Sequence, residues 1–414
     1  MTTSTFPTGF LWGVASAGHQ SEGDNVHSDT WFAENVTPTV FRDRSGRACN
    51  GYELWASDVD LAAGMGLTAY RFSVEWARIE PVEGELSMKA LDHYEAIVDR
   101  CLERGMAPVV TFNHFTSPHW FAMGGGWLDV DAPAVFARYC DAVMERFGDR
   151  IVYAVTMNEP NLARLLTWID LPQFVRDLER ATLAAASEAA GVDRYRLSNV
   201  MLPEEMDAMA DGMAAGHVAA KAVIKARRPD LPVGMSVAIV DDVVVGDDPS
   251  VRDRKREDVY ARWLELARDD DFVGVQNYER NWYDGSGAVD EHGGPGGTGL
   301  YHGIHPGSLA GAVRYAQEAT GRPVLITEHG RATSDDAERA GFIAPSLAAL
   351  LDVVESGVPV LGYFHWTLMD NFEWIFGYSQ QLGLHEVDPE TFVRTAKPSA
   401  EVYASIVRAG GGLS

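Results

Sequence analysis

The sequence predicts an α/β fold: a single-domain (β/α)8 barrel, or TIM barrel, over residues 1–414. Eight short apolar or β-branched runs recur along the chain, and most gaps between them hold helix-like segments. Strands of this kind that alternate with helices form a parallel sheet, and eight such units in one chain are typical of a barrel. No break in composition and no internal repeat divides the chain. A doubly wound open sheet is the alternative.

The strands are expected where an apolar run is bounded by turn residues, because a strand buried on both faces is apolar throughout. In chain order the runs are FLWGVAS at 10–16, AYRFSVEW at 69–76, APVVTFNHF at 107–115, IVYAVTMNE at 151–159, VGMSVAI at 233–239, FVGVQNY at 272–278, VLITE at 324–328 and VLGYFHWT at 360–367.

The gap between the second and third runs illustrates a crossover helix. Apolar residues recur there at spacings of three and four, which places them on one face of a helix. These residues are Leu91, Tyr94, Ile97, Val98 and Leu102. Gly105 follows, and glycine commonly ends a helix.

Two other segments do not read as simple crossovers. The longest gap, 161–232, contains alanine-rich helical stretches and is expected to add extra helices to the barrel. The glycine-rich stretch DGSGAVDEHGGPGGTG at 284–299 is interpreted as a mobile loop.

Charge and composition exclude several classes of function. The chain has 60 acidic and 34 basic residues, a formal net charge of −26, which repels nucleic acid and anionic membranes. No run of about 18 apolar residues could span a bilayer. The start of the chain, MTTSTFPTGF, does not resemble a secretory signal, so a cytoplasmic location is expected. A neutral small-molecule substrate fits this composition.

The three cysteines predict no metal site and no disulfide framework. Cys49, Cys101 and Cys140 are sparse, odd in number and form no CxxC pair. They are expected to be free, structural thiols in a reducing compartment.

Polar side chains stand at or near the ends of the expected strands, where a barrel places its reactive groups. They are Gln20, Arg71, His114, Asn158, Glu159, Tyr278, Glu328 and Trp366. Glu159 and Glu328 are carboxylates from strands far apart in the sequence. Each alone would be read as an exposed or helix-capping residue. Two carboxyl groups that face each other across a pocket are what cleavage of a glycosidic bond requires.

The chain resembles glycoside hydrolase family 1, the retaining β-glycosidases, from GFLWGVASAGHQSEG at 9–23 to NFEWIFGYSQQLGL at 371–384. TMNEP at 156–160 matches the family's acid/base segment, and ITEHG at 326–330 matches its nucleophile segment. The resemblance implies that Glu328 is the nucleophile, ionised and held by Arg71 and Tyr278. It implies that Glu159 is the protonated acid, with the two carboxyls about 5–5.5 Å apart.

The resemblance also implies the sugar contacts. The partners of the sugar hydroxyls would be Gln20, His114, Asn158, Glu373 and Trp374, with Trp366 as the floor. A β-D-glucoside is the expected substrate, with a galactoside or fucoside as alternatives, and Glu373 would repel a 6-phosphate. No cofactor and no metal are implied.

The sequence departs from the family pattern at several positions. The differing residues are Phe115, Gln276, Asn277, His329, Gln381 and Leu382. His329 stands where asparagine usually follows the nucleophile, so a neighbouring hydrogen bond is expected to differ. NLARLLTWIDLPQF at 161–174 replaces a segment that shapes the aglycone side, so aglycone preference does not follow from the resemblance.

Three alternatives stay open at this point: a catalytically silent sugar-binding relative, a transglycosidase, and a metal hydrolase. The last would draw on His114, His119, His302, His305, His329 and His365, which form no HxH or HExxH pair. The sequence does not indicate the oligomeric state.

Overall fold

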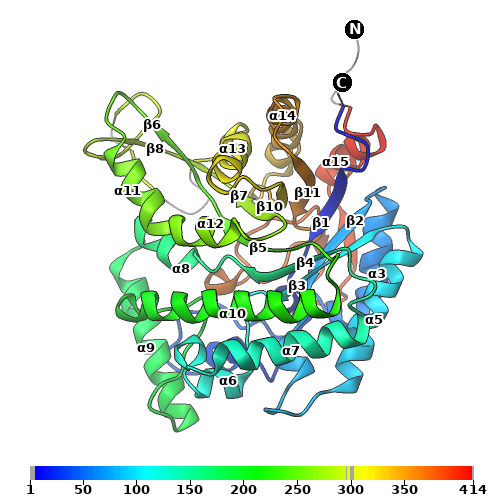
Figure 1. Ribbon diagram of the computed structural model, residues 1–414, viewed down its shortest axis with the longest axis vertical. Helices are drawn as coiled ribbons and strands as arrows, with labels where there is room; N and C mark the ends of the chain where they lie inside the picture. Colours follow the sequence, from blue (N-terminus) through cyan, green and yellow to red (C-terminus); the bar gives the residue numbers. More distant parts are fainter. Residues whose placement is uncertain (1–4, 295, 299–302, 413–414) are drawn as a thin grey trace.

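The computed structural model describes residues 5–294, 296–298 and 303–412. Eight parallel strands close into a barrel in the order β1-β11-β10-β7-β5-β4-β3-β2, so the fold is the predicted (β/α)8 TIM barrel (Figure 1). Every expected run corresponds to one barrel strand, and β10 extends one residue beyond its run. These strands are β1 (Leu11–Ala15), β2 (Ala69–Ser73), β3 (Ala107–Asn113), β4 (Tyr153–Asn158), β5 (Val233–Ala238), β7 (Val273–Asn277), β10 (Val324–His329) and β11 (Val360–Trp366).

The first strand closes the barrel. β1 pairs with the last barrel strand, β11, through Val14 opposite His365, and with β2 through Ala15 opposite Arg71. Because a closed sheet has no free edge, all strand ends on one side converge on one region. Residues that follow strands far apart in the sequence are therefore neighbours.

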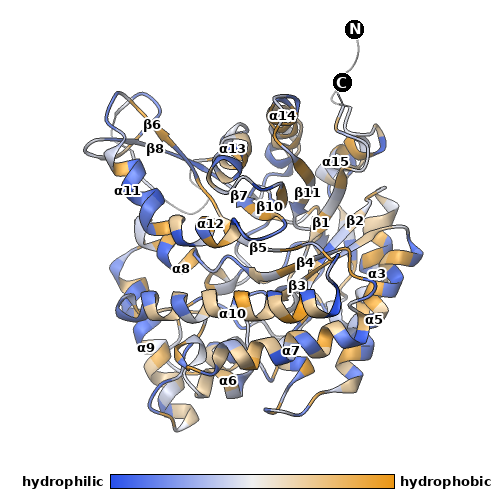
Figure 2. Ribbon diagram, viewed as in Figure 1, coloured by the Kyte–Doolittle hydropathy of each residue, from blue (hydrophilic) through white to orange (hydrophobic). Residues whose placement is uncertain are grey.

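Helices surround the barrel with their apolar faces toward the strands (Figure 2). The longer ones are α3 (Gly51–Gly64), α5 (Met88–Glu103), α7 (Ala132–Phe147), α10 (Met206–Arg227), α13 (Ser308–Thr320), α14 (Asp336–Glu355) and α15 (Pro398–Arg408). A hydrogen bond links α15 to β1: the Tyr403 hydroxyl donates to the Gly13 carbonyl at 2.8 Å.

Helix α5 matches its prediction except at one position. Gly105 follows the helix end with a φ of +72°, a conformation that glycine adopts without strain. Leu102 is 43% exposed, so its assignment to the buried face is wrong. Cys101 is fully buried instead, because it lies three residues after Val98 and its side chain points to the barrel.

The segment between β4 and β5 carries the expected extra helices. They are α8 (Leu162–Leu165), the 3-10 turn η2 (Leu166–Trp168), α9 (Gln173–Ala190) and a second turn, Pro203–Glu205, before α10. Leu183 and Ala186 of α9 pack with Tyr195 and Phe372 in a separate apolar cluster, which anchors this helix beside the barrel mouth.

A small sheet was not predicted. β6 (Asp241–Val244), β8 (Arg280–Asp284) and β9 (Gly287–Val289) form three strands beyond the barrel. β9 lies within the glycine-rich stretch that was interpreted as a mobile loop, and it pairs antiparallel with β8. The interpretation is therefore wrong for 287–289, while residues 295 and 299 of that stretch lie outside the described residues.

Cys49, Cys101 and Cys140 are free and buried, as expected. Burial raises the pKa of the Cys49 and Cys101 thiols to about 12, which disfavours the nucleophilic thiolate form.

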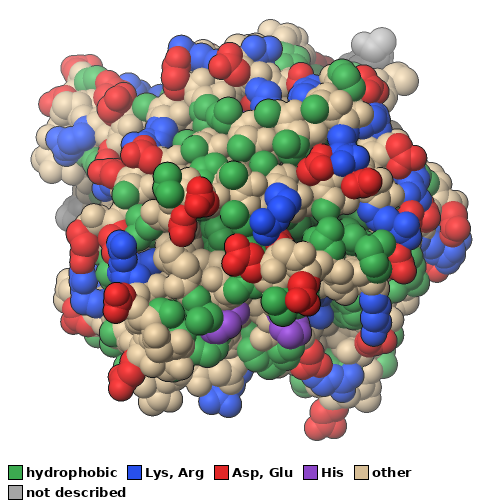
Figure 3. All heavy atoms as spheres, turned by 60° about the horizontal axis from the view of Figure 1, so that its bottom comes forward, with side chains coloured by type: hydrophobic (Ala, Val, Ile, Leu, Met, Phe, Trp, Pro, Cys, Tyr) green, Lys and Arg blue, Asp and Glu red, His purple; other side chains and the backbone are tan. Residues whose placement is uncertain are grey.

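Within the described ranges, no helix has both the length and the apolar character needed to cross a membrane. Basic side chains are commonly paired with neighbouring carboxylates, as Arg150 is with Glu95 and Asp99 at 2.6 and 2.5 Å. The face in Figure 3 shows acidic and basic side chains interspersed. Such pairing weakens the attraction of these cations for a polyanion.

Candidate active site

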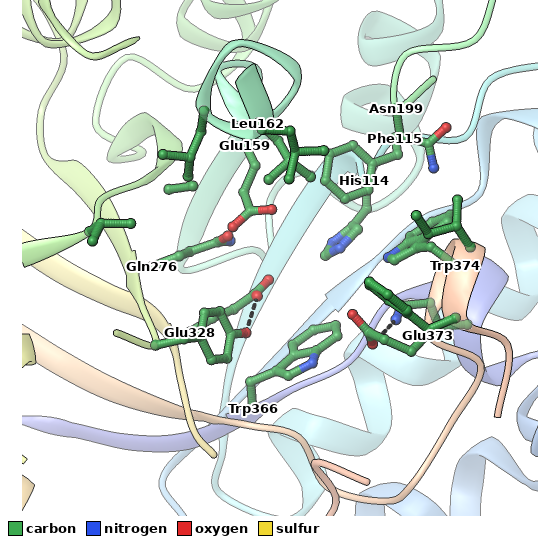
Figure 4. A pocket seen from close by; sticks show the side chains of 18 of the residues that line it. His114, Phe115, Glu159, Leu162, Asn199, Gln276, Glu328, Trp366, Glu373 and Trp374 are labelled. Atoms are coloured by element: carbon green, nitrogen blue, oxygen red, sulfur yellow. Dashed lines mark hydrogen bonds between the residues drawn. The ribbon is translucent and has the colours of Figure 1, made fainter. Parts of the chain in front are cut away.

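A pocket that is partly open to solvent lies where the barrel strands end (Figure 4). It collects most of the predicted site residues, drawn from segments across the whole chain. Those that line it are Gln20, His114, Glu159, Tyr278, Glu328, Trp366, Glu373 and Trp374. Arg71 and Asn158 are buried beside them and reach the site through hydrogen bonds.

The two glutamates sit at irregularities in the sheet. The β10–β7 pairing shifts register between Ile326 and Glu328, and the β4–β5 pairing shifts between Val155 and Asn158, just before Glu159. Such irregularities redirect side chains at the rim of a barrel. They explain why an apolar strand such as VLITE can end by presenting a carboxylate to the pocket.

Glu328 is held on both of its oxygens. Its Oε1 accepts a hydrogen bond of 2.7 Å from Arg71 Nη1, and its Oε2 accepts one of 2.7 Å from the Tyr278 hydroxyl. The residue is 4% exposed. The two donors fix the carboxyl group and favour its ionised form.

Arg71 itself is fully buried and has no freedom to move away. Its Nη1 also donates to the Thr327 carbonyl at 3.1 Å, its Nε donates to Thr111 Oγ1 at 3.0 Å, and its Nη2 donates to Asn158 Oδ1 at 2.5 Å. A planar guanidinium with several fixed partners orients both Glu328 and Asn158.

Glu159 is placed by backbone geometry instead of side-chain partners. Its φ is +45°, a left-handed conformation that costs a non-glycine residue about 1–3 kcal/mol and is common at active sites. Its backbone N–H donates to the Ser236 carbonyl at 2.8 Å, which fixes this turn. Among the described residues its carboxyl has no hydrogen-bond partner, and Figure 4 shows it directed into the same space as Glu328.

The two carboxyl groups titrate differently because their surroundings differ. Burial, the charge of Glu328 and the charge of Glu373 raise the pKa of Glu159 well above its usual value. Burial also raises the pKa of Glu328, but the charge of Arg71 and the hydrogen bonds from Arg71 and Tyr278 oppose that rise. Glu328 is therefore the first of the pair to ionise, and Glu159 keeps its proton to higher pH.

Another part of the pocket lining combines polar side chains with flat aromatic rings. Gln20 Nε2 donates to Glu373 Oε2 at 3.0 Å. The His114 ring is stacked on Trp366, with centroids 5.6 Å apart, and on Trp374, with centroids 6.2 Å apart. A flat aromatic surface bordered by hydrogen-bonding groups suits a sugar ring.

Several buried polar atoms here have no partner within the described part of the chain. They are Gln20 Oε1, His114 Nδ1, Asn158 Nδ2 and Gln276 Oε1. Burial and the charge of Arg71 lower the pKa of His114 well below its usual value, so its ring is neutral and offers one donor and one acceptor. Gln20, His114 and Gln276 line the pocket, and hydroxyl groups of a ligand are chemically suitable partners for such atoms.

Sequence reasoning missed part of the lining. Gln276 was noted only as a departure from the family pattern, yet its Nε2 donates to Asn158 Oδ1 at 2.6 Å and to Ser236 Oγ at 3.0 Å. The aliphatic side chains of α8 and η2 also line the pocket, with Glu179 and Asn199. The unusual segment 161–174 was the feature of the sequence that could have indicated these lining residues. Its composition, however, did not show which side chains face the pocket.

His329, the residue after the nucleophile candidate, does not line the pocket. Its Nδ1 shares a hydrogen bond of 2.9 Å with the Tyr363 hydroxyl, which in turn lies 3.2 Å from His365 Nδ1. Burial lowers the pKa of His329 to about 3, so the ring is neutral. A histidine in place of the family's usual asparagine therefore contacts residues behind β10 and adds no charge beside Glu328.

Within the described residues, no three His, Cys, Asp or Glu side chains are grouped so that they could hold a metal ion. His302, one of the histidines considered above, lies outside those residues.

Comparison with known proteins agrees with this geometry. The family model of glycosyl hydrolase family 1 matches residues 2–186 and 296–411. Thermostable beta-glucosidase B of Thermobispora bispora is 31% identical and covers 98% of this chain and 91% of its own.

Solved structures are similar along the whole chain. That of beta-glycosidase BGL167 is 42% identical with a TM-score of 0.87, covering 98% of this chain and 97% of its own. A Thermotoga maritima beta-glucosidase in complex with deoxynojirimycin is 26% identical with a TM-score of 0.83, covering 99% and 100%.

Proposed function

The chain belongs to glycosyl hydrolase family 1, and we propose that it is a retaining β-glycosidase that removes a terminal β-linked sugar by double displacement. Its relatives support β-glycoside hydrolysis as the reaction class. The observation that carries the retaining mechanism is the contrast between two buried carboxyl groups in one pocket. Glu328 is held by a cation and a hydroxyl, whereas Glu159 lacks such partners among the described residues.

In the first step Glu328 attacks the anomeric carbon while Glu159 gives its proton to the glycosidic oxygen. The bond between the anomeric carbon and that oxygen breaks, and the aglycone leaves as a neutral alcohol. A covalent ester then joins the sugar to Glu328. The Arg71 and Tyr278 contacts keep the attacking carboxylate ionised and correctly oriented.

In the second step the ionised Glu159 takes a proton from water, whose oxygen attacks the anomeric carbon. The ester bond breaks, Glu328 is released as a carboxylate, and the sugar leaves with its original anomeric configuration. Loss of the negative charge of Glu328 during the first step lowers the pKa of Glu159, which suits its change from acid to base.

The sugar itself is proposed to be a β-D-glucoside, with a galactoside or fucoside as alternatives. Gln20, His114, Asn158 and Glu373 would bind its hydroxyls, and Trp366 would lie under the ring. The unpaired atoms of Gln20, His114 and Asn158 support these assignments, because hydroxyl groups would satisfy them. No cofactor enters the reaction as proposed.

We also propose that the whole chain acts as one catalytic domain in the cytoplasm. The pairing of β1 with β11 supports the single domain, since it joins the two ends of the barrel. The three free cysteines support a reducing compartment.

Proton NMR of a fresh digest tests this proposal. Hydrolysis of 4-nitrophenyl β-D-glucoside should release the β-anomer first, with the α-anomer appearing only by mutarotation. Initial release of the α-anomer would contradict the double displacement.

A further inference from the structure

We propose that the leaving-group side of this pocket is built for an apolar, uncharged aglycone in preference to a second sugar. The inference rests on the proposed β-glycosidase function, and it concerns the residues that follow Glu159.

The position of the acid locates the leaving group. A general acid must lie within hydrogen-bonding distance of the oxygen that it protonates, so the aglycone has to lie next to Glu159. The backbone N–H of Leu162 donates to the Glu159 carbonyl at 2.9 Å, which fixes the first turn of α8 beside the acid. Figure 4 shows Leu162 next to Glu159 at the pocket wall.

The wall beyond Glu159 is aliphatic. Leu162, Leu165 and Leu166 line the pocket from α8 and η2, and Ile239 and Val240 line it from the segment after β5. None of these side chains can donate or accept a hydrogen bond. A second sugar placed against them would give up water without replacement partners, which is costly, whereas an alkyl or aryl group would gain from the same contact.

The charge of the pocket disfavours an anionic aglycone. Carboxyl groups line it, including those of Glu179 and Glu279, and none of its described lining residues is Lys or Arg. Burial raises the pKa of Glu179, which reflects the low polarity of that side. Glu179 and Asn199 add polar groups to the lining, but the residues proposed to bind the sugar, including Gln20, His114 and Glu373, are more numerous.

Calorimetric titration with methyl, butyl and hexyl 1-thio-β-D-glucosides and with thiocellobiose tests the wall directly. The sulfur linkage resists acid-assisted cleavage, so affinity is measured whether or not the protein turns over substrate. Affinity should rise roughly twofold to fourfold for each methylene that reaches the wall. Hexyl thioglucoside should bind more tightly than thiocellobiose. Equal affinities along the series, or tighter binding of thiocellobiose, would overturn the inference.

Substitutions of the wall residues test whether these residues cause the tighter binding of longer alkyl chains. Leu166→Gln changes a partly exposed wall residue, and it should lower the ratio of hexyl to methyl affinity by roughly threefold or more. Leu162→Gln provides a second test of the same wall. The control is Val130→Gln, because Val130 is 90% exposed and does not line the pocket. An unchanged ratio in both leucine variants would overturn the assignment.

The same series of O-glucosides separates this inference from the proposed function. Hydrolysis with kcat/KM independent of chain length would support the glycosidase and overturn the apolar wall. Affinity that rises with chain length in the absence of any hydrolysis would support the wall and contradict the glycosidase.

Discussion

The Tyr278 hydroxyl lies 2.7 Å from Oε2 of Glu328 and donates a hydrogen bond to it. This contact is one of the interactions that oppose the effect of burial on the pKa of Glu328. It joins a side chain that follows β7 to one at the end of β10, and the barrel brings them together although they are 50 positions apart in the chain.

Tyr278→Phe removes only that hydroxyl. The pKa of Glu328 should rise, so the acidic limb of the pH profile of kcat/KM should move to higher pH. Since one charge-assisted hydrogen bond is lost, kcat/KM should fall by about tenfold or more. The matched control is Tyr153→Phe, because Tyr153 begins β4 at the opposite end of a barrel strand. An acidic limb that stays in place would show that Tyr278 does not tune Glu328.

Glu159→Ala removes the proposed acid. Hydrolysis of an alkyl glucoside, whose leaving group needs a proton, should slow by about 10²–10⁴-fold. A 2,4-dinitrophenyl glucoside should lose much less in its first step, because its leaving group departs without protonation. Azide should restore turnover by giving the β-glycosyl azide, since azide attacks without a base. Equal losses for both substrates would be inconsistent with an acid at this position.

Glu159→Gln should change how stability depends on pH. The folded-state pKa of Glu159 is raised, so between the unfolded and folded values the folded protein binds the additional proton, and its stability falls as pH rises. The variant lacks this loss. The difference between the free energies of unfolding of the variant and of the wild type should therefore increase with pH in that window. The increase should be up to about 1.4 kcal/mol per pH unit.

Urea titrations at several pH values measure this difference. Glu83→Gln serves as the control, because Glu83 is exposed and lies outside the pocket. A constant difference between the Glu159 variant and the wild type across pH would refute the burial effect.

Glu373 should reject a sugar 6-phosphate. The residue is 8% exposed and lines the pocket, where its carboxylate would repel a like charge. We expect kcat/KM for 4-nitrophenyl β-D-glucoside 6-phosphate to be on the order of 100-fold or more below that of the unphosphorylated substrate. Glu373→Gln should bring the kcat/KM values of the phosphorylated and unphosphorylated substrates closer together. If the substitution leaves the ratio of the two kcat/KM values unchanged, Glu373 does not cause the discrimination against the 6-phosphate.

The sequence predicted the barrel well because its strands are buried on both faces. Such strands read as continuous apolar runs: VGMSVAI contains β5, and VLITE is all of β10 except its last residue. The small sheet of β6, β8 and β9 was not predicted. Its strands are short, and RNWYD at 280–284 mixes polar with aromatic residues, so they lack that signal.

The grouping of several proposed sugar-binding residues around one pocket was likewise predictable, because they belong to short motifs at or after strand ends. The positions of Gln20, His114 and Glu373 around the pocket follow from those motifs and from closure of the barrel. The wall at Leu162 and Leu166 was not predictable. Those leucines follow an irregular turn at Glu159, and only the folded backbone shows which of them face the pocket.

The central claim is that Glu328 forms a covalent bond to the sugar. Intact-protein mass spectrometry after incubation with 2,4-dinitrophenyl 2-deoxy-2-fluoro-β-D-glucoside, followed by peptide mapping, tests it most directly. The fluorine slows the second step and lets the intermediate accumulate. The expected result is one added fluorosugar on the peptide that contains Glu328. Sugar on another residue, or no added mass with the gluco-, galacto- and fuco-configured reagents from a protein that still binds glycosides, would contradict it.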